Sequence, residues 1–483
     1  MAGVGVVGAG AVGLTLAARL AQHGITVDLF EAEPRPARVG SRAICMQRET
    51  LEIWARLGVG DAVAARGVQW RVGRTYFRGR RLFEVHLPGD DEHFPPFVNI
   101  SQSEVEDLLE ARATELGVRL HRGLRLASLA QDPDGVDATF ETDAGRVTHR
   151  FDHVVGTDGA HSSVRHAIGI AFDGYTFDDR FLIADIRAVL PFSNERHFHF
   201  DPPWNPGRQV LIHPQPDGVW RIDWQVPPET DADAERESGG MDRRIRQVIG
   251  PSTPYELVWM TGYRFSQRIA ATFRSGRVFL AGDAAHVMSP FGARGLNSGV
   301  ADAENLAWKL ARGSDALLDT YDAERRSAAI ENLAATDATM HFMAPHGPLR
   351  RAWRDIVLRM APRSAWFRAR VNSGRLAEPA TYAASGIVAP GPVDPSLPRH
   401  GSVAPDVALP GGGRLRERLG RGYALVVSGE LPAPAGMDVI GVGTGGRFGS
   451  GRAWLVRPDG YLADSAALED TTALERLARA ASG

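Results

Sequence analysis

Several residue types are rare in this sequence, and each shortage excludes a kind of chemistry. Cys45 is the only cysteine among 483 residues, which excludes an internal disulfide and a cysteine-based metal cluster. Lys309 is the only lysine among the 55 lysine and arginine residues, so it alone is open to lysine chemistry such as Schiff-base formation. Residues 1–18 carry no charge, but five glycines interrupt them, unlike a signal peptide, and no other run approaches the length of a membrane span.

The charge balance is close to neutral. With 55 basic and 58 acidic side chains, the formal net charge of -3 gives no electrostatic basis for binding nucleic acid or an anionic membrane. The hydrophobic share of 43% and the charged share of 23% are those of an ordinary globular protein. We expect a cytoplasmic chain without a metal site, because cysteine is so scarce. We also expect two or three domains, because 483 residues exceed one ordinary core.

The N-terminus has the pattern of a nucleotide-binding βαβ unit. A short apolar strand is followed by the fingerprint G-x-G-x-x-G at Gly8, Gly10 and Gly13, then by a helical pattern and a second strand that ends at Glu31. Gly8 permits the tight turn, Gly10 lets a pyrophosphate approach the backbone, and Gly13 lets the helix pack closely on the sheet. The helix start offers free N–H groups to an anion, and Glu31 is placed to bind ribose hydroxyl groups. We therefore predict a Rossmann-type dinucleotide-binding domain.

Two acidic residues far along the chain close apolar runs and add to this site. Asp158 ends the run HVVGTDG, and Gly282-Asp283 ends the run FLAGD. An acid at the carboxyl end of a strand lies where open α/β sheets bind ligands. Each could accept hydrogen bonds from a polyhydroxy chain, which favours the ribityl chain of FAD over a second ribose. A helix that begins at Gly295 points to the same place.

The remaining segments differ in pattern from the N-terminus. Residues 175–270 have mainly strand patterns, including a hairpin whose turn lies at Asp217-Gly218. Helical periodicity then continues to about residue 375, and a segment rich in proline and glycine follows. We predict four parts: a dinucleotide-binding domain of residues 1–174 and 271–375, an inserted β-rich substrate domain of residues 175–270, a linker of residues 376–400 and a small α/β domain of residues 401–483.

Three ordered motifs give the chain a resemblance to a known enzyme family. The glycine fingerprint, DGAHSSVR from Asp158 and AGDAAHVMSPFGARGLNSG from Ala281 are similar to motifs of the single-component (class A) FAD-dependent aromatic hydroxylases, which have the p-hydroxybenzoate hydroxylase fold. The resemblance covers about residues 3–375. The segment LVRPDGYLAD resembles the thioredoxin-like appendage of phenol hydroxylase and 3-(3-hydroxyphenyl)propionate hydroxylase relatives. The implied fold is α/β: a Rossmann-type FAD-binding domain with an inserted β-rich domain and a thioredoxin-like C-terminal domain.

The resemblance implies contacts for the nucleotide part of FAD. The three fingerprint glycines would hold the pyrophosphate and Glu31 the adenosine ribose. Arg42, in GSRAICMQRE, would contact the pyrophosphate from the opposite side, and Gln102, in ISQSEVEDLL, would reach the flavin chain. Asp158 and Arg165 belong to a motif that the family links to both FAD and NAD(P)H.

The resemblance also implies contacts for the flavin part. Asp283, with Gly282, would bind the ribityl chain, and Pro290 would line the flavin edge with Phe291 as a neighbour of the ring. The helix that faces the ring would begin with three residues: Gly295, Leu296 and Asn297. The candidates for direct involvement in catalysis are Pro290, Phe291 and Arg42.

The activity that the resemblance implies is the hydroxylation of a phenolic or polycyclic aromatic substrate. NAD(P)H would reduce the flavin, O2 would add at C4a, and the hydroperoxide would transfer one oxygen atom to the ring, while the protein supplies position and excludes water. Three alternatives stay open: an FAD-dependent dehydrogenase or reductase, a halogenase of the same fold, and a non-catalytic flavin-binding scaffold. The spacing W-x-x-x-W at Trp220 and Trp224 departs from the halogenase motif W-x-W-x-I-P.

The substrate pocket is expected to include one face of the strand WRIDWQV. Because side chains alternate along a strand, one face carries Trp220, Ile222 and Trp224, and the opposite face carries Arg221, Asp223 and Gln225. We assign the apolar face to the pocket, together with His213. Core packing would explain the aromatic residues equally well, and capping of the hairpin would explain His213.

Four charged residues of the helix that begins at Gly295 have a simpler interpretation. Asp302 and Glu304 lie early in the helix, and Lys309 and Arg312 lie late, so that they complement the helix dipole. We interpret all four as ordinary charges on the helix surface. The expected partner of the chain is a small aromatic molecule, and a homodimer stays open.

Overall fold

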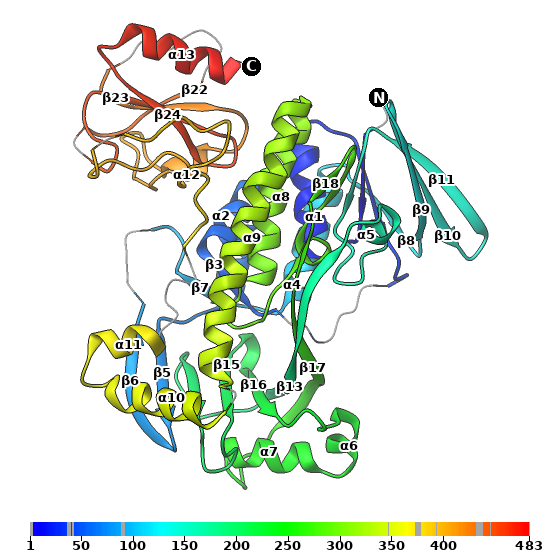
Figure 1. Cartoon of the computed structure of the whole chain (residues 1–483), viewed down its shortest axis with the longest axis vertical. Coiled ribbons are helices and arrows are strands. Elements are labelled where there is room, and N and C mark those ends of the chain that lie inside the picture. Colours follow the sequence, from blue (N-terminus) through cyan, green and yellow to red (C-terminus); the bar gives the residue numbers. More distant parts are fainter. Residues whose placement is uncertain are drawn as a thin grey trace.

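The computed structural model describes residues 3–35, 40, 43–87, 92–345, 347–371, 378–392, 394–430, 438–444 and 446–482. Figure 1 shows a small C-terminal domain at one end of the molecule and a β-rich domain at the other. Between them run two long helices, α8 (Gly295–Arg312) and α9 (Asp315–Met343), beside the sheet that contains the N-terminal strand.

The central sheet has six strands in the order β18-β19-β12-β1-β2-β8. Its members are β18 (Arg274–Ser275), β19 (Val278–Leu280), β12 (His153–Gly156), β1 (Val4–Val7), β2 (Val27–Glu31) and β8 (Arg119–Arg122). All neighbouring pairs from β19 to β8 are parallel. The glycine turn after β1, the turn after β12 and the loop after β19 therefore meet at one edge, as the motifs predicted.

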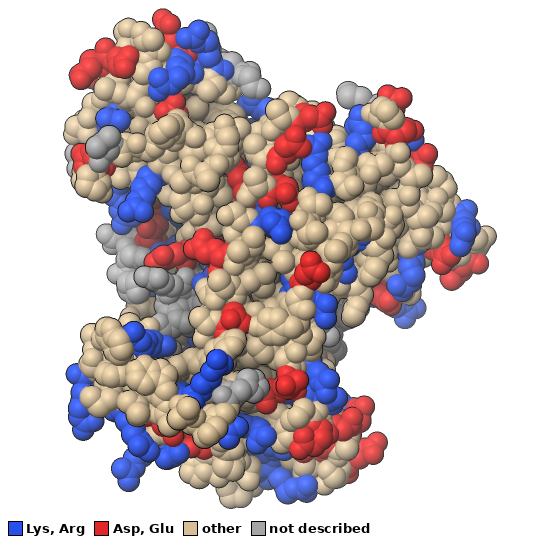
Figure 2. Space-filling view, in the orientation of Figure 1, with Lys and Arg blue, Asp and Glu red and all other residues tan. Residues whose placement is uncertain are grey.

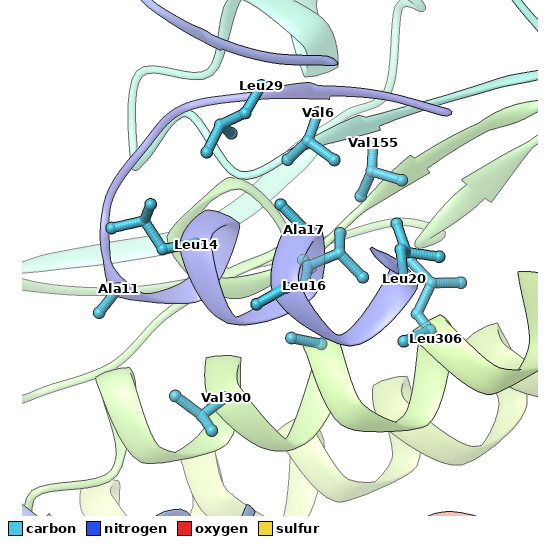
Figure 3. Packing of buried hydrophobic residues seen from close by; sticks show 14 of the residues in the cluster. Val6, Ala11, Leu14, Leu16, Ala17, Leu20, Leu29, Val155, Val300 and Leu306 are labelled. Carbon is cyan, nitrogen blue, oxygen red and sulfur yellow. The ribbon is translucent and has the colours of Figure 1, made fainter. Parts of the chain in front are cut away.

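Helix α1 (Ala11–Gln22) packs between this sheet and α8, as Figure 3 shows for Leu16, Ala17 and Leu20. The glycines permit that close contact. Gly8 has a φ of +105°, which a residue with a side chain rarely adopts. A Cβ on Gly13 would lie 1.9 Å from the carbonyl oxygen of Gly8. The predicted turn and packing roles of these two glycines are confirmed.

The β-rich domain is an eight-stranded sheet in the order β20-β17-β13-β16-β15-β14-β5-β6. Its strands are β20 (His286–Val287), β17 (Glu256–Ala270), β13 (Phe172–Arg187), β16 (Val219–Val226), β15 (Gln209–Pro214), β14 (Arg196–Phe200), β5 (Val72–Phe77) and β6 (Arg80–His86). The hairpin of β15 and β16 confirms the predicted turn at Asp217-Gly218, which contains the short turn η1 (Pro216–Gly218).

The sheet extends beyond the predicted segment of residues 175–270. Strands β5 and β6 join it because β14 pairs in parallel with β5, a contact between residues more than a hundred positions apart. Local patterns carry no information about such a pairing, so the predicted boundary left both strands in the other domain. Helices α6 (Ala232–Glu237) and α7 (Gly240–Ile249) follow β16, and α7 packs on one face of the sheet.

Smaller elements complete the part of the chain that precedes the C-terminal domain. Three strands form a separate antiparallel sheet: β9 (Arg125–Asp132), β10 (Gly135–Thr142) and β11 (Gly145–Phe151). Another short sheet contains β3 (Cys45–Gln47), β7 (Phe97–Asn99) and β4 (Val68–Gln69). The remaining helices of this part are α2 (Arg48–Arg56), α3 (Gly60–Arg66), α4 (Gln102–Glu115), α5 (Ser163–Ala167), α10 (Pro348–Met360) and α11 (Ala365–Val371).

The C-terminal domain has a mixed four-stranded sheet in the order β22-β21-β23-β24. It consists of β22 (Asp438–Gly441), β21 (Ala424–Ser428), β23 (Arg452–Val456) and β24 (Leu462–Ala467), with α12 (Leu415–Arg418) and α13 (Thr471–Ser482). It confirms the predicted small α/β domain, while the thioredoxin-like assignment stays a prediction. The described part of the predicted linker runs along this domain, because the Ala389 N–H donates to the Ala463 carbonyl.

Helix α8 is buried almost all round, which overturns the surface interpretation for three of its four charges, while Arg312 is exposed as predicted. Asp302, Glu304 and Lys309 are at most 3% exposed. Helices α1, α2 and α9 contact α8, and the C-terminal domain reaches it through Asp459. The buried charges form ion pairs that we call the interdomain network: Arg19, Arg56, His286, Asp302, Glu304, Lys309, Glu324, Arg325, Arg457 and Asp459.

On the face drawn in Figure 2, acidic and basic side chains both occur along the whole length of the molecule. None of the helices in the described ranges combines the length and apolar composition that crossing a bilayer requires.

Candidate functional site

A cavity of about 590 Å³ joins the nucleotide-binding edge of the central sheet to one face of the β-rich domain. The fingerprint turn and the start of α8 line one end, and strands β13 to β16 line the other. The volume lies in the usual range for small-molecule sites. Three segments that are remote in the sequence therefore contribute to one cavity.

The nucleotide end has backbone N–H groups that already bind carboxylates. The Ala9 N–H donates to Glu31 Oε2 at 2.8 Å, and the Ala11 N–H donates to Glu106 Oε1 at 3.1 Å. Gln102 donates to the same Glu106 oxygen at 2.8 Å. Burial raises the pKa of Glu106. These donors at a helix start suit an anionic group such as a pyrophosphate, so the residues fit FAD here.

Glu106 was not among the predicted site residues. It lies four positions after Gln102 on α4, so the two side chains share one face of the helix. That spacing was a usable signal once Gln102 had been assigned to the cavity. Arg42, the other residue predicted to contact the pyrophosphate, lies outside the described residues.

Asp158 and Arg165 do not line the cavity, although Thr157 and Gly159 do. The Asp158 carboxylate accepts hydrogen bonds from Ser162 Oγ at 2.5 Å and from the Val164 N–H at 3.1 Å. Arg165 donates to the Ala284 carbonyl at 2.9 Å, beside Asp283. This geometry gives both residues a loop-holding role, and their direct contact with a nucleotide stays a prediction.

At the flavin end, the predicted motif brings its residues together around the start of α8. Asp283 lies in the turn η2 (Gly282–Ala284) and is exposed to the cavity. Gly282 does not line the cavity and instead provides the turn, with a φ of +61°. Four of the other predicted residues also line the cavity: Pro290, Gly295, Leu296 and Asn297.

Asn297 uses its side chain to join the helix start to a neighbouring segment. Its Oδ1 accepts from the Gln47 N–H at 2.9 Å and from Thr50 Oγ1 at 2.7 Å, and its Nδ2 donates to the Cys45 carbonyl at 3.0 Å. The amide therefore fixes the shape of the cavity wall. The first N–H groups of α8 have no partner within the helix, as at any helix start, and suit a group that becomes anionic.

Phe291 packs in an aromatic cluster at the middle of the cavity. Its ring centroid lies 5.5 Å from those of Phe181 and Phe265, in edge-on arrangements. Such arrangements are the preferred ones for aromatic pairs. Phe291 thus lines the cavity as predicted, and it contacts residues of the substrate domain as well as the flavin-side loop.

The predicted apolar face of β16 does not line the cavity. Trp220, Ile222 and Trp224 are buried in a core that includes Met241 and Ile245 of α7. Because side chains alternate along a strand, the opposite face of β16 is left for the cavity. The position of α7 decides which face of β16 is buried in the core and which lines the cavity. The sequence of the strand alone does not contain that information.

Charged and polar residues therefore line the substrate end: Arg196, His213, Arg221 and Asp223. Arg221 donates to both oxygens of Asp185, at 2.8 and 2.7 Å. Burial raises the pKa of Asp223 to about 7, and burial holds the pKa of His213 well below its usual value. His213 was a predicted pocket residue and does line the cavity, with its Nε2 3.9 Å from Asp223 Oδ2.

Comparison with known proteins identifies the family. A family model described as "FAD binding domain" matches residues 1–336, and the chain belongs to that family. FAD is therefore the cofactor that the nucleotide end of the cavity takes, in agreement with its donor groups.

Individual relatives are hydroxylases and monooxygenases. The 3-(3-hydroxy-phenyl)propionate/3-hydroxycinnamic acid hydroxylase of Mycolicibacterium smegmatis is 32% identical over 74% of this chain and 64% of its own length. Rifampicin monooxygenase of Streptomyces venezuelae is 34% identical over 73% of this chain and 74% of its own length. A crystal structure of aklavinone-11 hydroxylase with FAD and aklavinone is 28% identical, with a TM-score of 0.80 over 100% of this chain and 99% of that one.

These relatives confirm the resemblance that the three motifs indicated, and the last one confirms the fold across both main domains. The chain spans 64% or less of the length of the curated relatives first matched, which include the hydroxylase of Mycolicibacterium smegmatis.

Proposed function

We propose that this chain is an FAD-dependent monooxygenase that hydroxylates an aromatic small molecule with NAD(P)H and O2. The observation that carries the proposal is the continuity of the cavity from the fingerprint turn to the aromatic and charged face of β13 to β16. A reduced flavin and an aromatic ring could lie side by side in such a cavity. Bound FAD, once reduced by NAD(P)H, would supply the activation of O2.

The residues of the chain bind the cofactor and keep water from it. Asp283 would accept hydrogen bonds from the ribityl chain, and Pro290 and Phe291 would cover the ring edge. The start of α8 would stabilise negative charge on the reduced ring, by about 0.3–1 kcal/mol if exposed and up to about 2 if partly buried. The aromatic cluster around Phe291 excludes water from the centre of the cavity, which protects reactive intermediates.

The proposal is tested by turnover of the FAD-loaded protein with a panel of phenols, phenylpropionates and polycyclic aromatics. We expect at least one compound to stimulate NAD(P)H oxidation and to yield a hydroxylated product in proportion to the O2 consumed. Peroxide without product would favour a dehydrogenase or reductase, and a halogenated product in the presence of chloride or bromide would favour a halogenase. No stimulation by any compound would favour a flavin-binding scaffold.

The assignment of Asp283 has its own test. Asp283→Ala removes an ionised acceptor from the cavity, so we expect FAD to bind about tenfold to a hundredfold more weakly. The measurement is a fluorescence titration of the apoprotein with FAD. Asp233→Ala, which changes a largely exposed carboxylate on α6, is the matched control and should leave FAD affinity unchanged. Full FAD occupancy of purified Asp283→Ala would contradict the role.

We further propose a cytoplasmic location for the chain. A homodimer stays open and can be examined by light scattering of the FAD-loaded protein.

A further inference from the structure

We propose that the substrate end of the cavity binds an anionic group of the aromatic substrate, and that Arg196 is the residue that receives it. This inference rests on the proposed function, because it assigns a subsite within the same cavity. The substrate would then be an aromatic acid, and a carboxylate is the simplest anionic group that it could carry.

The main observation is that Arg196 lacks an anionic partner. Arg196 lies at the start of β14 and lines the cavity. Its side chain makes no hydrogen bond or ion pair with any residue in the described ranges, and its Nε is buried without a partner. Its guanidinium lies over two aromatic rings, 6.0 Å from the ring centre of Trp70 and 5.6 Å from that of Phe198. Arg196 is half-buried, and a guanidinium that is partly shielded from water without an ion pair is costly, so a bound anion would lower that cost.

The neighbouring charges do not supply the missing partner. Asp185 is engaged by both Arg221 and Gln215, which donates to it at 3.0 Å. Asp223 interacts electrostatically with Arg196 but forms no ion pair with it, and burial raises the pKa of its carboxyl to about 7, so about half of it carries a proton at pH 7. When Asp223 is protonated, this end of the cavity has one more positive charge than negative charges.

Two unpaired polar atoms lie beside Arg196. Neither Nδ1 of His213 nor Oδ1 of Asp223 has a hydrogen-bond partner. A carboxylate could accept from the guanidinium fork, whose geometry matches its two oxygens, and from a protonated Asp223. The Cys45 thiol, whose pKa burial raises to about 12, stays neutral and adds no competing anion.

The remaining walls specify an aromatic body for the ligand. The apolar side chains that line the cavity near this end are Phe181, Ile183, Leu211, Phe265 and Phe291. Aromatic rings gain from packing edge-on or offset against such rings. The arrangement therefore matches a flat apolar body that ends in one charged group.

The test measures binding to the FAD-loaded protein without NAD(P)H, through the shift in the flavin absorbance spectrum. The probes are aromatic acids of increasing size, from 3-hydroxybenzoate and 3-(3-hydroxyphenyl)propionate to a hydroxynaphthoate, each with its primary amide. We expect at least one acid to bind tenfold or more tightly than its amide, as for a hydrogen-bonded ion pair. Arg196→Met should abolish that preference, and Arg196→Lys should retain part of it, because a lysine keeps the charge but not the fork.

The matched control is Arg264→Met. Arg264 also lines the cavity but is exposed, so its charge is hydrated without a ligand. Arg264→Met should keep most of the preference for the acid. Loss of the preference in Arg264→Met, but not in Arg196→Met, would overturn the assignment.

Three other results would also overturn the inference. These are an equal affinity of the wild type for every acid and its amide, no binding of any acid at millimolar concentration, and a preference that persists in Arg196→Met. If Arg196→Met kept the preference but slowed flavin reduction by NAD(P)H, the residue would bind a dinucleotide phosphate instead. The binding measurements do not depend on turnover. The proposed hydroxylation can therefore fail while the preference for an acid stands, and the preference can fail while the hydroxylation stands. If Arg196→Met does not fold, the wild-type comparison still decides whether the cavity prefers an acid, and Arg196→Lys then tests the role of Arg196.

Discussion

Two groups of charge in this molecule, one buried and one half-buried, differ in how completely they are paired. In the interdomain network each carboxylate meets a cation at 2.6–2.8 Å, as Glu324 does with Lys309 and Arg457. At the substrate end of the cavity, Arg196 has no ion pair with any residue that the structure describes, and Asp223 has a carboxylate oxygen without a hydrogen-bond partner.

The difference separates charges that support the fold from charges that await a ligand. A buried ion pair with good geometry holds segments in register, and removing one partner exposes the cost of the other. The interdomain network joins α8 and α9 to Arg457 and Asp459 of the C-terminal domain. It also reaches the flavin loop, because Asp302 accepts from the Gly282 N–H at 3.0 Å. The unpaired charges hold no such segments together.

The largest expected effect follows from removing a charge inside the interdomain network. Burial opposes ionisation of Glu324, but Arg457 and Lys309 outweigh it and hold its pKa well below the usual range. Glu324→Gln leaves two buried cations without that counter-charge, so we expect the free energy of unfolding to fall by about 3–5 kcal/mol. Denaturant unfolding, followed by far-UV circular dichroism, measures the change.

Glu256→Gln provides the control for that variant. Glu256 is largely exposed and pairs with Arg187 on the surface, where such a pair contributes about 0–1 kcal/mol. The two variants remove the same charge from a buried and from an exposed pair. Similar small losses in both would show that the interdomain network does not hold the domains together.

A smaller effect concerns the pH dependence of stability, which should have opposite signs in the two regions. Burial opposes ionisation of Asp302, but His286 and Arg325 outweigh it and lower its pKa to about 2. Its contribution is thus present above its ordinary pKa near 4 and is lost as the pH falls toward 2. Burial raises the pKa of Asp223 to about 7, so its contribution is lost as the pH rises from about 4 to 7.

Unfolding measured at pH 5 and pH 8 distinguishes the two carboxylates. Asp223→Asn should gain stability relative to the wild type at pH 8 by more than about 1.4 kcal/mol, the equivalent of one pKa unit. Asp302→Asn should be less stable than the wild type at both values. A loss of stability at pH 8 in Asp223→Asn would mean that the ionised carboxylate is paired. Asp223 would then not differ from Asp302 in this respect.

Much of the nucleotide half of the molecule was predictable from the sequence. Gly8 and Gly13 are required by backbone conformation and by contact with the adjacent turn, so their spacing carries the fold directly. Asp283 and the start of α8 follow from a rule about strand ends in parallel sheets. The hairpin of residues 209–226 follows from its turn residues.

The rest depended on contacts between segments that are distant in the sequence. The charges of α8 are buried because α1, α2, α9 and the C-terminal domain surround the helix, which its own periodicity does not reveal. The face of β16 that meets the cavity is decided by α7. Arg196 lies in the short segment RHFHF, whose place in the sheet is fixed by pairing with β5, and no local pattern indicated its role.

The most direct test of the central claim is a crystal structure of the FAD-loaded protein with the aromatic acid that binds best. The account predicts the flavin ring beside Pro290 and the start of α8, with the carboxylate of the ligand within hydrogen-bond distance of the Arg196 guanidinium. A ligand whose carboxylate points into solvent, while Arg196 contacts only water and its aromatic neighbours, would contradict it.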